Sequence, residues 1–258
     1  MRTHYDGRSL KRRLTLLVLV STTWAALPVR ADEKLPTGEA IMEKYLKRSG
    51  GEKAYARIKD RVSSGTVISD RSEMHITIYE TEPNKRFVET EAGGGVVRRG
   101  TDGNVVWRVG SSRTTVLEGA ARNRELVKAF FHMPLKWREL CVKAECKEIT
   151  EINGRKCYKV DLTTKYDFPQ TYYIAVDSNL LVAVERKLRR GSVEKTVRRV
   201  MEDYKEVDGI LYPHKITQSL DGQGQIKFLL DSIKHNTDLH PDLFALPHEV
   251  IDALEENG

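Results

Sequence analysis

The sequence predicts an α+β protein that is mainly β, with a large curled antiparallel sheet of about ten or eleven strands and helices in its concave side. Three observations lead to this prediction. From Asp60 onward, runs in which apolar and polar residues alternate recur about every ten residues. Turn dipeptides such as Asn153-Gly154 and Asp208-Gly209 separate the runs, as in hairpins. Two or three amphipathic helical segments are too few to cover such a sheet, so we expect the sheet to curl around them.

Residues 1–31 have the pattern of a secretory signal. A basic region ends in Lys11–Arg13, an apolar run follows over Leu14–Leu27, and small or apolar residues at the third and last positions before the cut suit cleavage after Ala31. The apolar run is shorter than the ~20 residues that a spanning helix needs, which disfavours a membrane anchor as the alternative. We therefore expect an exported, periplasmic protein that does not span a membrane after cleavage, with residues 32–258 as a single domain.

Most of the net positive charge of the chain lies in this signal. The whole chain carries 43 Lys and Arg against 37 Asp and Glu, a net charge of +6. Residues 1–31 contain six of the basic residues and one of the acidic residues, so the remainder carries only +1. A nearly neutral mature protein gives no electrostatic reason to expect a nucleic-acid partner, and none is predicted.

Three segments are predicted to be helical. Residues 36–49 place apolar residues at helical spacing, and Gly50-Gly51 ends the pattern. A short second helix is expected around residues 52–58. A longer helical stretch over residues 119–140 interrupts the series of strands, and Pro134 breaks it in two. These are the helices that we expect in the concave side of the sheet.

The three cysteines of the predicted mature chain cannot all pair within it. A two-residue turn at Asn153-Gly154 would place Cys146 opposite Asp161, four residues out of register with Cys157. That offset is roughly 13 Å along the strands, too far for a disulfide. The favoured disulfide is Cys141–Cys146, as a small loop clip, which leaves Cys157 as a free thiol packed in a strand.

Patterns that carry enzyme chemistry are weak in this sequence. There is no G-x-S-x-G segment, and the glycine run Gly93–Gly95 lacks the Lys-Ser/Thr of a phosphate-binding loop. The densest cluster of histidines and aspartates, within residues 235–248, does not match the ligand spacing of standard zinc sites. We therefore predict no enzyme activity, no metal and no cofactor, and keep a hydrolase with a site in residues 235–248 as the least favoured alternative.

The segment "YKEVDGILYPHKI", residues 204–216, contains one histidine, His214, whose pattern could indicate either a catalytic residue or an ordinary strand residue. Asp208-Gly209 suits a hairpin turn, and His214 then shares a strand face with Tyr212 and with isoleucines rather than with acids or other histidines. Pro213 cannot donate to a sheet ladder, so we expect it at an edge, a bulge or a strand start. The segment is typical of a strand and does not indicate a catalytic site.

Any apolar part of the concave face that the helices leave uncovered is a candidate site for an apolar ligand. Each candidate residue could equally belong to the ordinary core, which is where most such side chains lie. The candidate lining residues are Ile76, Ile78, Phe87, Trp107, Phe130, Trp137, Tyr173 and Phe228.

Six segments, taken in their order along the chain, resemble exported proteins of the outer-membrane lipoprotein carrier superfamily (LolA/LolB-like), and most closely the branch called outer membrane lipoprotein-sorting proteins. The resemblance covers nearly all of residues 36–247. The segments are "GGEKAYARIKDRVSSGTV", "TDGNVVWRV", "INGRKCYKVDL", "TYYIAVDSNLLV", "DYKEVDGILYPHKI" and "DLHPDLFALP".

The resemblance implies an unclosed, strongly curved antiparallel half-barrel whose mouth is covered by helices. It also implies a non-enzymatic periplasmic binding or carrier protein that holds an acyl chain, a lipid or a lipoprotein in the cavity, including a role in lipoprotein sorting to the outer membrane. The alternative is an envelope interaction or sensor module whose cavity is filled by its own helices and whose partners are other cell-envelope proteins. An exposed Trp137 at the rim would favour that alternative.

Overall fold

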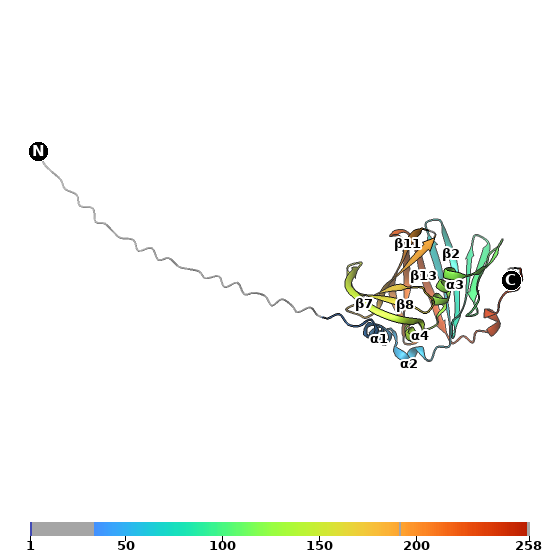
Figure 1. Ribbon diagram of the computed structural model, residues 1–258, viewed down its shortest axis with the longest axis horizontal. Helices are drawn as coiled ribbons and strands as arrows, with labels where there is room; N and C mark the ends of the chain where they lie inside the picture. Colours follow the sequence, from blue (N-terminus) through green and yellow to red (C-terminus); the bar gives the residue numbers. More distant parts are fainter. Residues whose placement is uncertain (2–33, 191, 257–258) are drawn as a thin grey trace. The chain divides into compact units, whose positions relative to one another are not determined.

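The structure is a computed structural model that describes Met1, residues 34–190 and residues 192–256. Residues 2–31 of the predicted signal lie outside the described residues, so the signal stays a prediction. Leu35–Gly258 form one compact unit, and the fold is described for that unit (Figure 1). Among the described residues, no helix is both long enough and apolar enough to cross a membrane.

One antiparallel sheet of 13 strands forms the body of this unit. The sequence predicts about ten or eleven strands; the count differs because β4 and β6 show no clear alternation of buried and exposed residues. The order across the sheet is β6-β5-β4-β3-β2-β1-β13-β12-β11-β10-β9-β8-β7, so only β1 and β13 are neighbours that do not follow one another in the chain. The strands are β1 (Asp60–Ser69), β2 (Ser72–Thr81), β3 (Lys85–Ala92), β4 (Gly95–Thr101), β5 (Val106–Val109), β6 (Thr114–Leu117), β7 (Cys141–Ile152), β8 (Arg155–Thr164), β9 (Gln170–Ala175), β10 (Leu181–Arg190), β11 (Val193–Val207), β12 (Ile210–Leu220) and β13 (Gln223–His235).

Turns with a left-handed backbone join several of these strands, at the dipeptides that the sequence marks. Asn153-Gly154 has φ angles of 49° and 78°, and Asp208-Gly209 has φ angles of 51° and 83°. Positive φ at both central residues is the geometry of the type I′ turn, whose twist matches that of the flanking strands. Asn, Asp and Gly adopt this backbone at the least cost, which is why they mark the strand ends.

The sheet is strongly curved and does not close. Arg99 on β4 and Gln170 on β9 line one cavity, although their strands are eight positions apart in the sheet. At a strand spacing of ~4.8 Å, eight positions would span about 38 Å if the sheet were flat. The two arms of the sheet must therefore bend toward each other. The end strands β6 and β7 do not pair with one another within the described residues, so the barrel stays open.

Three helices pack against the concave face of the sheet. They are α1 (Gly38–Ser49), α3 (Gly119–Ala129) and α4 (Trp137–Leu140), and they share a large apolar cluster with residues of β7 to β10. Of the three, α1 and α4 contact β7 in one arm, whereas α3 also contacts β4 and β5 in the other arm. Thr37 begins α1 by accepting a hydrogen bond from the backbone N–H of Ala40 at 3.2 Å. The short α2 (Gly51–Tyr55) follows α1 at once. The predicted helical segments are therefore present, and the break between α3 and α4 includes the predicted Pro134.

The C-terminal segment packs on the outer face of the sheet. It consists of a 3-10 helix, η1 (Pro241–Phe244), and α5 (His248–Glu255). Phe244 and Val250 are buried in one cluster with Trp107 of β5. Helices therefore cover the concave side, as expected, but a further helix also covers part of the convex side.

The predicted disulfide between Cys141 and Cys146 is not present, because all three cysteines are free thiols. The segment that was expected to form a loop is the start of strand β7. Five residues of extended strand separate the two α-carbons by about 16 Å, whereas a disulfide requires roughly 4.4–6.8 Å. A bulge next to Cys146 also shifts its partner from the expected Asp161 to Val160. Cys157 is a buried free thiol, as expected.

Strand β12, which contains Pro213 and His214, lies in the middle of the sheet between β11 and β13. Its described pairing with β13 begins only at Lys215, so Pro213 lies where one side of the strand has no ladder partner. A missing N–H costs least at such a place. His214 is buried, and its Nδ1 hydrogen-bonds to the carbonyl oxygen of Tyr212 at 3.1 Å. The histidine therefore has a structural role in the strand.

The pairing of β1 with β13 requires glycine at position 65, and this requirement can be tested. A Cβ at Gly65 would fall 2.0 Å from the carbonyl oxygen of Leu229 on β13. We expect Gly65→Ala to lower the free energy of unfolding by about 1–3 kcal/mol, because the backbone must shift to admit the methyl group. Urea unfolding followed by circular dichroism measures the change.

Gly110→Ala is the matched control, because its new Cβ would approach nothing closer than the Arg113 carbonyl oxygen at 3.7 Å. We expect the control to unfold at the urea concentration of the unmodified protein. Equal stability of the two variants would contradict the close approach of β1 and β13.

Candidate functional site

A cavity of about 550 Å³ lies between the concave face of the sheet and the segment 125–140. Small-molecule sites typically enclose roughly 300–1,000 Å³, so the cavity has the size of a ligand site. Residues from the centre of the sheet and from both arms line it. Its apolar side chains are Ile76, Ile78, Val127, Phe130, Met133, Pro134, Leu140, Leu211, Pro213, Ile216, Phe228, Leu230 and Ile233.

Four of the eight predicted lining residues lie in this cavity. Ile76 and Ile78 come from β2, Phe228 comes from β13, and Phe130 follows α3. Ile76 and Ile78 are two residues apart on β2, so they share one face of that strand. Contact between these residues and a ligand stays a prediction.

The structure places the other four predicted residues elsewhere. Phe87 and Tyr173 follow the cavity-lining residues Arg86 and Tyr172 directly, so they point to the opposite face of the sheet. Trp137 is buried in the helix cluster, and its indole N–H donates to Glu43 at 3.2 Å. Trp107, the fourth, borders only a smaller hollow.

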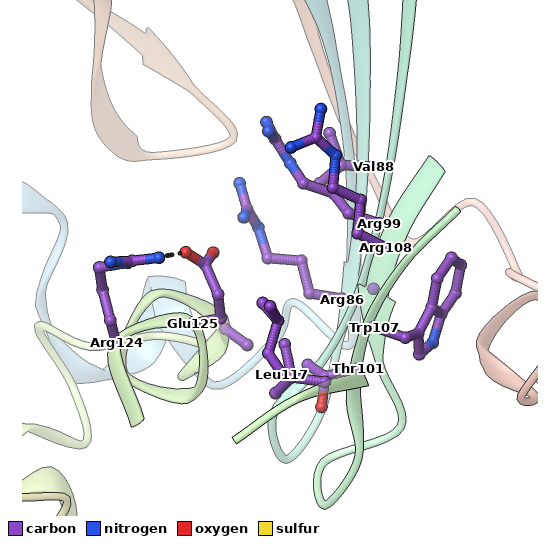
Figure 2. A pocket seen from close by; sticks show the side chains of 12 residues that line it. Arg86, Val88, Arg99, Thr101, Trp107, Arg108, Leu117, Arg124 and Glu125 are labelled. Carbon is purple, nitrogen blue, oxygen red and sulfur yellow. Dashed lines mark hydrogen bonds and ion pairs between the residues drawn. The ribbon is translucent and has the colours of Figure 1, made fainter. Parts of the chain in front are cut away.

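This smaller hollow, of about 220 Å³, shares Arg86, Arg99 and Glu125 with the main cavity. Figure 2 shows Arg86 pointing from its strand toward Glu125, with Trp107 on the far side of the strands. The two hollows therefore meet at a group of charged side chains.

Basic side chains dominate the polar lining of the two hollows. Eight basic residues line them, against the two carboxylates of Glu80 and Glu125. The sequence analysis missed this feature. It could have been found from arginines that lie two residues from an apolar residue on the same strand, such as Arg86 and Val88, because such residues share one face of the sheet. The eight basic residues are Arg61, Arg86, Arg99, Arg108, Arg124, Lys128, Arg186 and Arg199.

Glu80 on β2 is shared by two arginines. Arg61 donates from Nε to one of its carboxylate oxygens at 3.0 Å, and Arg86 donates from Nε to the other at 3.2 Å. Burial alone would raise the pKa of Glu80, but the two guanidinium groups outweigh burial and lower the pKa. One carboxylate therefore neutralises only one of two buried positive charges.

Glu125 on α3 is held in the same way. It accepts hydrogen bonds from Lys128 Nζ at 2.8 Å and from Arg124 Nε at 3.1 Å. Burial raises its pKa, but Lys128 and Arg124 outweigh burial and lower the pKa to about 2. Burial lowers the pKa of Lys128 to about 7, and Arg199 and Arg186 add to this effect although Glu125 opposes it. Burial is thus the main cause of the lowered pKa of Lys128, while the neighbouring cations favour the carboxylate form of Glu125 and disfavour a further ammonium group.

Arg186 and Arg199 are held by neutral amides. Arg186 donates from Nε to Gln170 at 3.0 Å, and Arg199 donates from Nε to Gln218 at 2.8 Å. Burial, followed by the nearby guanidinium groups of Arg186 and Arg86, lowers the pKa of Arg199 to about 9. The amides orient these two arginines but supply no opposite charge.

His132 is a further polar residue in the cavity lining. Burial lowers its pKa to about 4, so the ring is neutral near neutral pH. Its Nε2 then donates to the carbonyl oxygen of Ile58 at 2.7 Å, and its buried Nδ1 is left as an acceptor without a partner in the described structure. His132 therefore adds no positive charge to the cavity.

The histidines of residues 235–248 do not converge on a common site. His235 donates to Asp208 at 2.8 Å, whereas His248 lies 3.4 Å from Asp252 in its own helix. In the part of the chain that the structure describes, no group of three or more His, Cys, Asp and Glu side chains is placed to hold a metal ion.

The shared carboxylate of Glu80 generates a prediction for stability. We expect Glu80→Gln to lower the free energy of unfolding by about 3–5 kcal/mol at pH 7, because it leaves Arg61 and Arg86 buried without a counter-charge. Since the pKa of Glu80 is lowered in the folded state, its stabilising effect is present above the carboxyl's ordinary pKa and is lost as the pH falls through the folded-state pKa. The difference in free energy of unfolding between the unmodified protein and Glu80→Gln should therefore become smaller at acid pH.

Glu89→Gln on β3 is the matched control, since Glu89 forms an exposed ion pair with Arg98 at 3.2 Å. Such a pair contributes about 0–1 kcal/mol. Denaturant unfolding at several pH values compares the three proteins, and equal losses in both variants would contradict the role of Glu80.

Neither a family model nor a curated protein sequence matches the chain. Solved structures do match it. A DUF1329 family protein from Desulfovibrio piger is 9% identical, with a TM-score of 0.56 over 84% of this chain and 99% of that chain. An outer membrane lipoprotein-sorting protein domain from Vibrio parahaemolyticus is 13% identical, with a TM-score of 0.54 over 80% of this chain and 97% of that chain.

A LolA superfamily protein from Nitrosomonas europaea is also similar. It is 14% identical, with a TM-score of 0.55 over 82% of this chain and 99% of that chain. Identities this low establish likeness of fold and leave activity open. The resemblance seen in the sequence is thus supported at the level of structure, and the chain has the fold of the LolA-like superfamily.

Proposed function

We propose that this protein is a non-enzymatic binding or carrier protein of the bacterial cell envelope, which holds an acyl chain, a lipid or a lipoprotein in the cavity of its half-barrel. The predicted signal over residues 1–31 supports export to the periplasm. Sorting of lipoproteins to the outer membrane is one process that such a carrier would serve.

The observation that carries this proposal is the cavity itself. Its apolar side chains come from the sheet and from the segment that covers it, so they surround a ligand rather than present a flat surface. Transfer of an alkyl chain from water into such a site is favourable by about 0.8 kcal/mol per CH₂. Even part of one acyl chain would therefore supply useful affinity.

The likeness in fold points in the same direction. Two of the similar structures are described as a lipoprotein-sorting domain and as a LolA superfamily protein. That likeness is one of fold, and the apolar lining of this chain gives the independent reason to expect an acyl ligand.

The alternative function, an envelope interaction module, receives less support. Its cavity would be filled by its own helices, and Trp137 would be exposed at the rim. Helices α1, α3 and α4 do fill the concave face near β7, but the 550 Å³ cavity lies beside them. Trp137 is only 3% exposed, so it offers no docking surface.

Filling the cavity tests the proposal. We expect the purified protein to bind a fluorescent fatty acid and to release it when palmitate is added. We expect Ile78→Trp to weaken this binding by at least about tenfold, because the indole occupies space in the cavity that Ile78 lines and displaces several CH₂ groups of the ligand. Fluorescence titration measures the affinity, and native mass spectrometry tests for lipid that is retained through purification.

Ile149→Trp is the control, since Ile149 is exposed on β7. We expect it to bind as the unmodified protein does. The proposal fails if the unmodified protein binds no fatty acid and carries no lipid, or if the two variants weaken binding equally.

A further inference from the structure

Four arginines reach the main cavity from the two arms of the sheet. Arg86 and Arg99 come from β3 and β4, and Arg186 and Arg199 come from β10 and β11. We call these four residues the arginine cluster. After burial, the largest causes of the lowered pKa of Arg199 are Arg186 on its own arm and Arg86 on the other arm. The guanidinium groups of the two arms therefore face one common space.

The positive charge of this space is not balanced by the protein. Glu80 forms ion pairs with Arg61 and Arg86. Glu125 forms ion pairs with Lys128 and Arg124. Within the described residues, no carboxylate lies at ion-pair distance from Arg99, Arg186 or Arg199. Crowded, partly buried charges of one sign disfavour the free folded state, and an anion bound between them removes that cost.

The donor geometry is suited to an oxyanion. A guanidinium group presents a planar fork of N–H donors that matches two oxygens of a phosphate or a carboxylate. The Nε groups of Arg186 and Arg199 are already bonded to Gln170 and Gln218, which fixes the side chains. Their remaining N–H groups are the ones available to a ligand.

The floor between the two arms is apolar. In the order of the sheet, β2, β1, β13 and β12 separate β3 from β11, and they carry Ile78, Phe228 and Ile216 into the cavity. Arg199 lies over the ring of Phe228, with 5.2 Å between its guanidinium carbon and the ring centroid. Arg99 lies opposite Val88, which in turn lies opposite Ile78. Each arm thus places arginine beside apolar surface.

We propose that the arginine cluster binds the oxyanion headgroup, a phosphate or a carboxylate, of an amphiphile whose alkyl chain lies on the apolar floor between the two arms. This inference rests on the proposed carrier function and adds to it the chemical class of the ligand's headgroup. Free inorganic phosphate presents the same oxyanion to the arginines, so the experiment distinguishes it from the headgroup of an amphiphile.

Three probes are titrated calorimetrically into the full purified chain: dodecyl phosphate, dodecanol and inorganic phosphate, with the alkyl probes below their aggregation concentrations. We expect dodecyl phosphate to bind at least about tenfold more tightly than dodecanol, because charge-assisted hydrogen bonds add to the same alkyl burial. We expect Arg199→Gln to abolish this difference by weakening the binding of dodecyl phosphate, without weakening the binding of dodecanol. Arg186→Gln, on the neighbouring strand, should do the same.

Arg198→Gln is the matched control. It is the same substitution on the same strand, but Arg198 points to the outer face, where it pairs with Glu185. We expect it to keep the full preference for dodecyl phosphate. A loss of preference in this control equal to that in Arg199→Gln would overturn the assignment to the cavity.

The remaining outcomes separate this inference from the proposed function. Equal affinity of the unmodified chain for dodecyl phosphate and dodecanol overturns the headgroup site and leaves a carrier of alkyl chains. Binding of inorganic phosphate without either alkyl probe overturns both the amphiphile and the carrier function. Loss of dodecanol affinity together with the preference, in both Arg199→Gln and Arg186→Gln, would show collapse of the cavity and overturn headgroup recognition.

Discussion

Strands β4 and β9 lie eight positions apart in the sheet, and only strong curvature brings both to one cavity. Curvature follows from the twist of a long antiparallel sheet whose apolar face must be buried by few helices. Once the sheet curves, alternate side chains of every strand share one enclosed space. Side chains from many strands therefore line a single site. The isoleucines and the phenylalanine come from the centre of the sheet, and the arginines come from its arms. Every property of the cavity that bears on function depends on this constraint.

The charged side chains that line the cavity destabilise the protein when no ligand is bound. Eight basic groups face two carboxylates, and the lowered pKa values of Lys128 and Arg199 have burial as their largest cause, with neighbouring cations adding to it. A core designed for stability alone would hold apolar residues at these positions. Departures from local rules that are not compensated inside the protein are typical of functional sites, because the compensation comes from the ligand. The amides of Gln170 and Gln218 fit this view, since they fix the orientation of two arginines without neutralising them.

Much of the fold was predictable from local signals, and the site was predictable only in part. The type I′ dipeptides, the helix over residues 36–49 and the break at Pro134 are set by local backbone chemistry, so the sequence shows them directly. Lining residues depend on which face of a strand is the inner one. In β9 both faces are buried, because Tyr173 packs in an outer cluster while Tyr172 lines the cavity, so alternation could not choose between them. The arginine cluster was missed for a related reason: its members are far apart in sequence, and only the curvature of the sheet brings them together.

The division of the concave face limits how a ligand can lie. Helices α1, α3 and α4 already fill the region next to β7 and β8 with a large apolar cluster. The space that remains open is bounded below by β2, β13 and β12 and at the sides by the arms that carry Arg86, Arg99, Arg186 and Arg199. A purely apolar ligand would bury its surface on the floor but would also remove water from the guanidinium groups without replacing its hydrogen bonds, which is unfavourable. A purely ionic ligand would pair with the arms and leave the floor exposed to water. Only a molecule with both an alkyl part and an oxyanion satisfies the two surfaces at once, so the shape and the charge of the cavity select the same class of ligand.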